Sequence, residues 1–435
     1  MAAAALPLGD LKKLLCRLDE QPEQVLGTLH ALCDAAYPGA DSLAVIAAAG
    51  AIPPVVKLLG RDTPSKVQHE AAELMAVLAT HPDNASSITA SGAIPRLVQL
   101  LGPSSAAEVQ VTTAGALNNL AMHGAGNAAS ITGAGAIPAL ALLLGPGSSD
   151  NVRFSATSAL AFLANTEEGA LAIAAAGAIP PMVQMLGPDA RLQPLAQLAA
   201  AGTLANLAAH HDNADIISDA SAIPLLVQLL APASPPDVQD AAAGVLTHLA
   251  NNDEGAAEIA AAGAIPLLVG LLGSASPAMV HKHAVAALAN LACNEESAVI
   301  IAAAGGIPQL VRLLGPASPA ERVAANVLHN LAVDNEIAAI IAAAGAIPRL
   351  VPLLGADSPS DVQESAAGAM MCLAQIPAVA ATIAAAGATP PLLQLLGPGS
   401  SAEAQQAAAA TLLFLSSNSA DSRAEIAAAG SVTAS

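Results

Sequence analysis

Apolar residues recur along this chain in short runs that glycine and proline interrupt at regular intervals. A Gly-Ala-Ile-Pro segment, or a close variant of it, returns every 40 to 44 residues. Its prolines are Pro53, Pro95, Pro138, Pro180, Pro224, Pro266, Pro308, Pro348 and Pro390. Self-similarity at this period is typical of a helical solenoid, in which each unit buries its apolar face against its neighbours.

Each unit reads as three helices. A short helix such as 298–304 stops at Gly305, which suits a left-handed C-terminal position. The second helix restarts with Pro308 at the first helical position, where the missing N–H costs nothing. After a Ser-Pro or Ser-Ser turn, with Ser as the expected N-cap, the third and longest helix ends in Ala-Leu-x-Asn-Leu-Ala, as at 116–121.

Polar and apolar positions within a unit agree with these boundaries. Asn165, Asn252 and Asn294 are expected to be N-caps of short helices, because acidic residues follow each within three positions. Leu117 and Leu120 share one face of a third helix, so the sequence places them and their equivalents in the core.

The repeated motifs resemble the armadillo repeat family. Gly-Ala-Ile-Pro-x-Leu-Val-x-Leu-Leu is followed by Val-Gln-x-x-Ala-Ala and then Ala-Leu-x-Asn-Leu-Ala, in nine successive copies. The resemblance implies an all-α fold, a right-handed alpha-alpha superhelix of about nine to ten three-helix repeats. Residues 1–40 are expected to be a degenerate capping repeat, 41–430 the solenoid, and 431–435 the start of a further unit or a tail.

One position of the third helix is the candidate binding position. At the Asn of Ala-Leu-x-Asn-Leu-Ala the repeats carry Asn119, Asn206, His248, Asn290 and Asn330, among others. This position flanks the buried stripe, and an Asn both donates and accepts hydrogen bonds. In armadillo proteins it lines a concave groove where an Asn ladder holds peptide main chain, so the resemblance implies such a groove here. The alternative is that each Asn bonds to a neighbouring helix or an inter-repeat loop.

The position four residues earlier departs from one branch of the family. Nuclear-import adaptors carry Trp there, whereas this chain has no Trp and has glycine at Gly115, Gly202, Gly244 and Gly368. Glycine within a helix is costly, which suggests a close backbone approach by a neighbouring helix or a ligand; we expect close helix packing. The missing Trp array disfavours a nuclear-import adaptor.

Charge and cysteine content limit the classes of partner and the compartment that we expect for this protein. Fourteen basic against 34 acidic residues give a net charge of −20, which argues against nucleic acid and anionic lipid. Many of the acidic residues stand at the starts of short helices, where a negative charge stabilises the helix dipole, so they do not by themselves indicate a basic partner. Four widely spaced cysteines match no disulfide framework, so we expect a reducing compartment, cytoplasmic and/or nuclear. Prolines and glycines interrupt even the longest uncharged apolar stretch, 376–393, so we expect a soluble protein without membrane insertion.

Catalytic and metal motifs are not evident in the sequence. His281 and His283, two apart on a helix, point to different faces, and the adjacent His210 and His211 diverge likewise. No phosphate-binding loop, nucleophile elbow or zinc-protease motif is present. We therefore expect no enzyme activity, no cofactor and no metal.

The sequence favours a monomeric, non-catalytic scaffold that binds an extended segment of a partner protein along its third helices. The alternative hypothesis is the substrate-recognition part of a ubiquitin ligase assembly, although no U-box is recognisable. A nuclear-import adaptor is the weaker alternative.

Overall fold

The computed structural model describes residues 8–19, 22–36, 40–188, 193–273, 276–315, 320–418, 423–424 and 426–427. Within these residues all regular secondary structure is helical and no strand occurs, which confirms the all-α solenoid. By contact density the chain divides into two compact units, Met1–Leu225 and Leu226–Ser435, and each is described by itself. Residues 431–435, expected to begin a further unit, lie outside the described residues, as do parts of the expected capping repeat.

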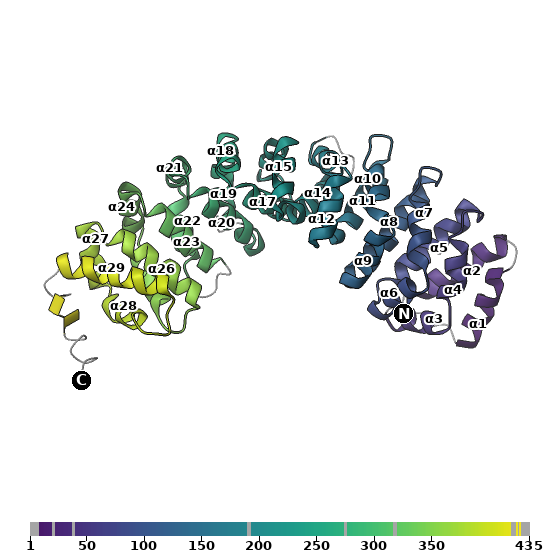
Figure 1. The fold of residues 1–435 in the computed structure, drawn as a ribbon, viewed down its shortest axis with the longest axis horizontal. Helices are drawn as coiled ribbons and strands as arrows, with labels where there is room; N and C mark the ends of the chain where they lie inside the picture. Colours follow the sequence, from purple (N-terminus) through teal and green to yellow (C-terminus); the bar gives the residue numbers. More distant parts are fainter. Residues whose placement is uncertain are drawn as a thin grey trace. The chain divides into compact units, whose positions relative to one another are not determined.

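The first unit begins with a cap of two helices and a short 3₁₀ turn, followed by three-helix repeats (Figure 1). Its elements are α1 (Leu8–Cys16), η1 (Arg17–Asp19) and α2 (Pro22–Ala36); α3 (Ala40–Ala48), α4 (Ile52–Leu58) and α5 (Ser65–Leu78); α6 (Pro82–Ala90), α7 (Ala93–Leu100) and α8 (Ala107–Met122); α9 (Ala125–Gly133), α10 (Ala136–Leu143) and α11 (Asp150–Leu163); α12 (Glu167–Ala175), α13 (Ile179–Gln184) and α14 (Gln193–Ala208); and α15 (His211–Asp219). The boundary between the units falls within α16 (Ala222–Leu229).

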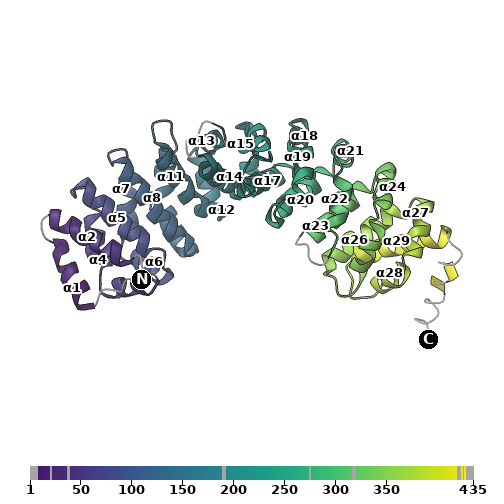
Figure 2. The same ribbon diagram turned by 180° about the vertical axis from the view of Figure 1, so that it is seen from behind.

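The second unit continues the same order of helices (Figure 2). Its elements after α16 are α17 (Pro236–Leu249); α18 (Asp253–Ala261), α19 (Ala264–Leu271) and α20 (Ala278–Leu291); α21 (Glu295–Ala303), α22 (Gly306–Leu313) and α23 (Glu321–Leu331); α24 (Asn335–Ala343), α25 (Ile347–Leu350), η2 (Val351–Leu354) and α26 (Ser360–Leu373); and α27 (Pro377–Ala385), α28 (Thr389–Leu395) and α29 (Ala402–Asn418).

The turn between the first and second helices of a repeat requires a left-handed residue. Gly305 has φ 77°, as the sequence predicts, and the same position is a positive-φ glycine in most other repeats. In one repeat Ser221 stands there instead and has φ 60°. Every other positive-φ residue in the described part of the chain is glycine, so Ser221 pays a steric penalty that its equivalents avoid.

Two expectations about helix starts need correction. Helix α22 begins at Gly306, so Pro308 is its third residue rather than its first; it still lies in the first turn, whose N–H groups have no intrahelical partner. Serine is the N-cap of a third helix at Ser149, which accepts from the Val152 N–H, but not at most of the others. There a proline in the extended conformation precedes the helix and offers no side-chain acceptor, as at Pro359 with ψ 148°.

The short helices begin largely as predicted. Asn252 accepts a hydrogen bond from the Gly255 N–H at 2.7 Å, and Asn294 accepts one from the Ser297 N–H at 3.1 Å. The prediction for Asn165 is wrong by one residue, because the Thr166 hydroxyl accepts from the Gly169 N–H instead. A hydroxyl one position later satisfies the same orphan donors.

Third helices form the continuous core of each unit. Adjacent third helices make the most extensive contacts, α5 with α8 and α8 with α11 in the first unit, and α17 with α20 in the second. Leu117 and Leu120 are 1% and 0% exposed, which confirms their predicted place in the core. Many of the fully buried residues are alanines, so the helices approach closely and the layer is thin.

A repeated glutamine links several third helices to the end of the second helix of their own repeat. Gln68 donates from its carboxamide to the Gly60 carbonyl at 2.8 Å, and Gln363 donates to the Gly355 carbonyl at 2.7 Å. Where the glutamine is replaced by His281, a ring nitrogen lies 3.3 Å from the equivalent Gly273 carbonyl. The Val-Gln of the repeat motif is therefore a structural device that closes the end of the second helix.

Candidate binding surface on the third helices

Four asparagines occupy the same place on four third helices. Asn119 lies on α8 and Asn206 on α14 in the first unit, and Asn290 lies on α20 and Asn330 on α23 in the second. All four side chains are half-buried, at the edge of the apolar stripe that packs into the core. We call these four residues the asparagine row.

Each carboxamide of the asparagine row donates to a backbone carbonyl of the preceding third helix. The acceptor precedes, by one residue, the equivalent position in the preceding repeat. The N···O distances are 2.9 Å for Asn119 to Ala76, 3.1 Å for Asn206 to Ala161, 2.8 Å for Asn290 to Thr247, and 3.2 Å for Asn330 to Ala289. Carbonyl oxygens only accept, so the amide nitrogen must face the preceding helix.

These bonds give the row a structural role that the sequence left as the alternative to a peptide groove. They also orient each carboxamide toward a fixed direction. The Asn119 oxygen accepts from the Asn118 amide at 3.1 Å, and the Asn290 amide also contacts the Asn251 oxygen at 2.6 Å. In the part of the chain that the structure describes, no donor reaches the carboxamide oxygen of Asn206, Asn290 or Asn330.

His248 takes the position of the row on α17. Its side chain is half-buried. Burial lowers the pKa of His248, and the nearby His283 lowers it further. The neutral ring carries one donor and one acceptor, as a carboxamide does. His283 in turn lies 2.7 Å from an Asp240 carboxylate oxygen.

The space around the glycine four residues before the row differs between repeats. A Cβ added at Gly115 or Gly202 would meet nothing within 4 Å, so the expected close packing of a neighbouring helix is wrong at these two positions. At Gly368 the expectation is correct, because an added Cβ would lie 2.7 Å from Nδ1 of His329 on α23. The surface is thus open in front of Gly115 and Gly202 and occupied in front of Gly368.

Two hollows lie along the third helices of the second unit, and one of them contains a residue of the row. Asn330 lines one of about 470 Å³, together with the exposed Cys293 and Val333 and the carboxylates Glu295 and Asp334. The other, of about 300 Å³, is formed by α23, α26 and α29 and has Gly368 and His329 in its wall. Both hollows are lined by apolar surface and by carboxylates.

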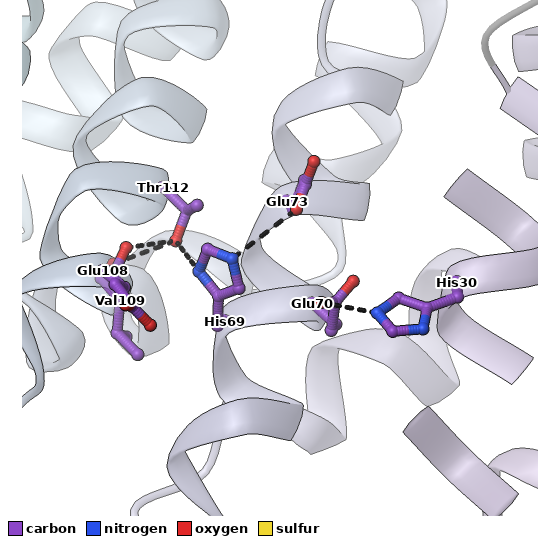
Figure 3. A network of polar contacts seen from close by, with 7 residues as sticks. All are labelled: His30, His69, Glu70, Glu73, Glu108, Val109 and Thr112. Carbon is purple, nitrogen blue, oxygen red and sulfur yellow. Dashed lines mark hydrogen bonds and ion pairs between the residues drawn. The ribbon is translucent and has the colours of Figure 1, made fainter. Parts of the chain in front are cut away.

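His281 and His283, which the sequence places on different faces of a helix, diverge in the structure. His281 contacts its own repeat's second-helix end, while His283 contacts Asp240 on α17. Among the described residues, the donor atoms of one group come within 4.8 Å of one another and could hold a metal: His69, Glu70 and Glu73 on α5 (Figure 3). This group was not predicted from the sequence, although the His-Glu-x-x-Glu spacing on a helix was the available signal.

No single helix within the described residues combines the length and the apolar character needed to cross a membrane. Five pairs of helices, each bent by 78–92°, reach these limits of length and composition only when taken together.

Comparison with known proteins agrees with the repeat. A family model described as Armadillo/beta-catenin-like repeat matches residues 81–122, 210–251 and 252–293. No curated protein sequence matches the chain. The crystal structure of an engineered protein from the Northeast Structural Genomics Consortium is 33% identical to it, with 93% of this chain and 98% of that chain covered and a TM-score of 0.83.

Proposed function

The chain belongs to the armadillo repeat family, and we propose that it binds an extended segment of a partner protein along the faces of its third helices. Armadillo repeats generally mediate protein interaction and are typically non-catalytic. The proposal therefore includes no chemical step, and the partner is recognised by contact alone.

The observation that carries the proposal is the asparagine row with its fixed orientation. Bonds such as that from Asn206 to the Ala161 carbonyl hold each carboxamide in place before a ligand arrives, which lowers the entropy cost of binding. Packed helices lie about 10 Å apart, and an extended chain advances about 3.3 Å per residue. Asn290 and Asn330 lie on the adjacent third helices α20 and α23 of the second unit, so their carboxamides would meet residues about three apart in a bound segment.

Open surface beside the row supports the same proposal. Gly115 and Gly202 leave room for backbone to approach α8 and α14, because no atom stands where a Cβ would be. A ligand held there would be held mainly through its main chain, since the chain has no Trp to clamp side chains. No particular contact among the described residues favours a ubiquitin ligase or a nuclear-import role.

The four free cysteines support a reducing compartment. We accordingly propose a cytoplasmic or nuclear protein that acts as a monomer.

Filling the open surface tests the proposal. Peptides selected from a random display library against the purified protein provide the probe. Gly115→Trp and Gly202→Trp should weaken the selected peptides at least tenfold without loss of helicity, because the indole occupies space that is open in the free protein. Trp at the exposed second-helix residues Gln99 and Gln184 is the matched control. Equal affinity for both pairs of variants would contradict the proposal.

A further inference from the structure

Three potential ligands lie together on α5, one helical turn apart. His69 and Glu73 have i, i+4 spacing, and Nε2 of His69 lies 3.7 Å from Oε2 of Glu73. Glu70 contributes a carboxylate on the same side, and the three donor atoms lie within 4.8 Å of one another. Ligands of a tetrahedral zinc ion with bonds near 2.1 Å are separated by about 3.4 Å, so small rotations of the glutamates bring the set to ligand distance.

The hydroxyl of Thr112 on α8 favours the tautomer of His69 that carries its proton on Nδ1 (Figure 3). This hydroxyl lies 3.1 Å from the carbonyls of both Glu108 and Val109, which only accept, so it donates its hydrogen to them. The hydroxyl oxygen, 3.5 Å from Nδ1 of His69, then accepts from the Nδ1–H. In this tautomer the lone pair of Nε2 faces the carboxylate of Glu73, 3.7 Å away, and the two acceptors offer a place for a cation.

His30 on α2 orients the third ligand. Its Nε2 lies 2.7 Å from Oε1 of Glu70, so the ring N–H donates to that oxygen and leaves the other for a ligand. Glu70 is the most buried of the group, with 14% of its side chain exposed, against 36% for Glu73. Metal ligands are commonly held in this way by hydrogen bonds from a second layer of residues. Here these residues are His30 and Thr112, on the two helices that flank α5, α2 and α8.

The geometry points to a binding site for a divalent first-row transition metal, with Zn²⁺ as the ion that suits one imidazole and two carboxylates. His69, Glu70 and Glu73 are the proposed ligands, and His30 and Thr112 are positioning residues. Three protein ligands leave at least one coordination position for water or for a side chain of a partner. This site is independent of the peptide-binding proposal, because it requires none of the asparagine row.

The experiment is a calorimetric titration of the EDTA-treated full chain with Zn²⁺ in excess Mg²⁺. We expect one Zn²⁺ site per chain that is tighter than any other. His69→Ala and Glu73→Gln should each weaken it at least tenfold, and Thr112→Val should weaken it about 10- to 100-fold by freeing the His69 ring. Co²⁺ added in place of Zn²⁺ should give visible absorption bands in the wild type that disappear in His69→Ala.

The matched control is His211→Ala. His211 and Asp215 repeat the i, i+4 spacing at 3.9 Å, but their side chains are 78% and 60% exposed, so loss of His211 should leave the tight site unchanged. Far-UV circular dichroism verifies the fold of each variant, and Glu73→Gln keeps the shape of a partly exposed side chain. The proposal is overturned if Zn²⁺ does not bind, if Glu73→Gln binds as tightly as the wild type, or if His211→Ala loses as much affinity as His69→Ala. Tight binding by Glu73→Gln would show that Glu73 is not a ligand, and equal losses in the two histidine variants would show that Zn²⁺ binds at scattered surface histidines.

Discussion

The carboxamide of Asn119 donates a hydrogen bond to the backbone carbonyl of Ala76, 2.9 Å away on the preceding third helix. The residue that we assign to peptide binding therefore also joins two repeats. The two roles are compatible, because one N–H is enough for the inter-repeat bond, and a carboxamide held in place is a better binding group than a free one.

Loss of this bond should be measurable as stability. Asn119→Ala should lower the free energy of unfolding by about 1 kcal/mol, because the Ala76 carbonyl loses its side-chain donor. Asn119→Asp should lower it further, since a carboxylate would face a carbonyl oxygen without a donor between them. Urea denaturation gives both values. If Asn119→Ala is no less stable than the surface control Gln99→Ala, the bond does not contribute to folding.

The glycines four residues before the row should respond to alanine in opposite ways. Gly202→Ala should raise the free energy of unfolding by about 1 kcal/mol, because alanine favours the helix and the new Cβ meets nothing. Gly368→Ala should bring no such gain, because the Cβ would lie 2.7 Å from Nδ1 of His329. The double variant Gly368→Ala/His329→Ala should recover part of it. Equal gains in the two single variants, measured by urea unfolding, would rule out the packing described for His329.

Replacing Ser221 by glycine should stabilise the protein. Its φ of 60° costs a residue with a side chain about 1–2 kcal/mol, and glycine returns about 0.5–1 kcal/mol of this as extra freedom of the unfolded chain. Ser221→Gly should therefore raise the free energy of unfolding by about 0.5–1 kcal/mol in thermal or urea unfolding. The reverse change, Gly263→Ser at the equivalent turn with φ 79°, should lower it. A loss of stability in Ser221→Gly would show that the turn is not strained.

His248 should make stability depend on pH. Burial and His283 lower its pKa in the folded state, so the unfolded chain takes up this proton first as the pH falls. The contribution is fully present above about pH 6.5 and is lost as the pH falls below that value toward the lowered folded pKa. His248→Asn should reduce this loss, measured as unfolding free energy at pH 7.5 and pH 5.5. If the pH dependence of the unfolding free energy is unchanged in His248→Asn, the loss of stability at low pH does not come from His248.

Sequence periodicity was sufficient to predict the fold, but it predicted the binding surface only in part. The spacing of glycine, proline and leucine predicted the three-helix unit, the left-handed Gly305 and the buried Leu117 and Leu120, because these depend on residues within one repeat. The direction in which the Asn119 amide points depends on a carbonyl 43 residues away, and the register between helices is not written in either helix alone.

The same limit applies to side chains that meet across repeats. Neither the contact of His329 with Gly368 nor the layer of residues around His69 follows from a motif, because each joins residues of separate third helices. The prediction of one helix start was wrong for a different reason. Thr166 and Asn165 are adjacent and both can cap, so composition alone could not choose between them.

Substitution of the asparagine row tests directly whether the third helices bind a peptide. Exposed glutamines at one equivalent position of four second helices provide a control of the same chemistry: Gln99, Gln184, Gln228 and Gln394. The measurement is the affinity of a selected peptide for the fourfold Asn→Ala variant of the row and for the fourfold Gln→Ala variant, each verified as folded. We expect at least a tenfold loss of affinity for the first variant and none for the second. Equal affinities would show that the peptide does not use the third-helix face.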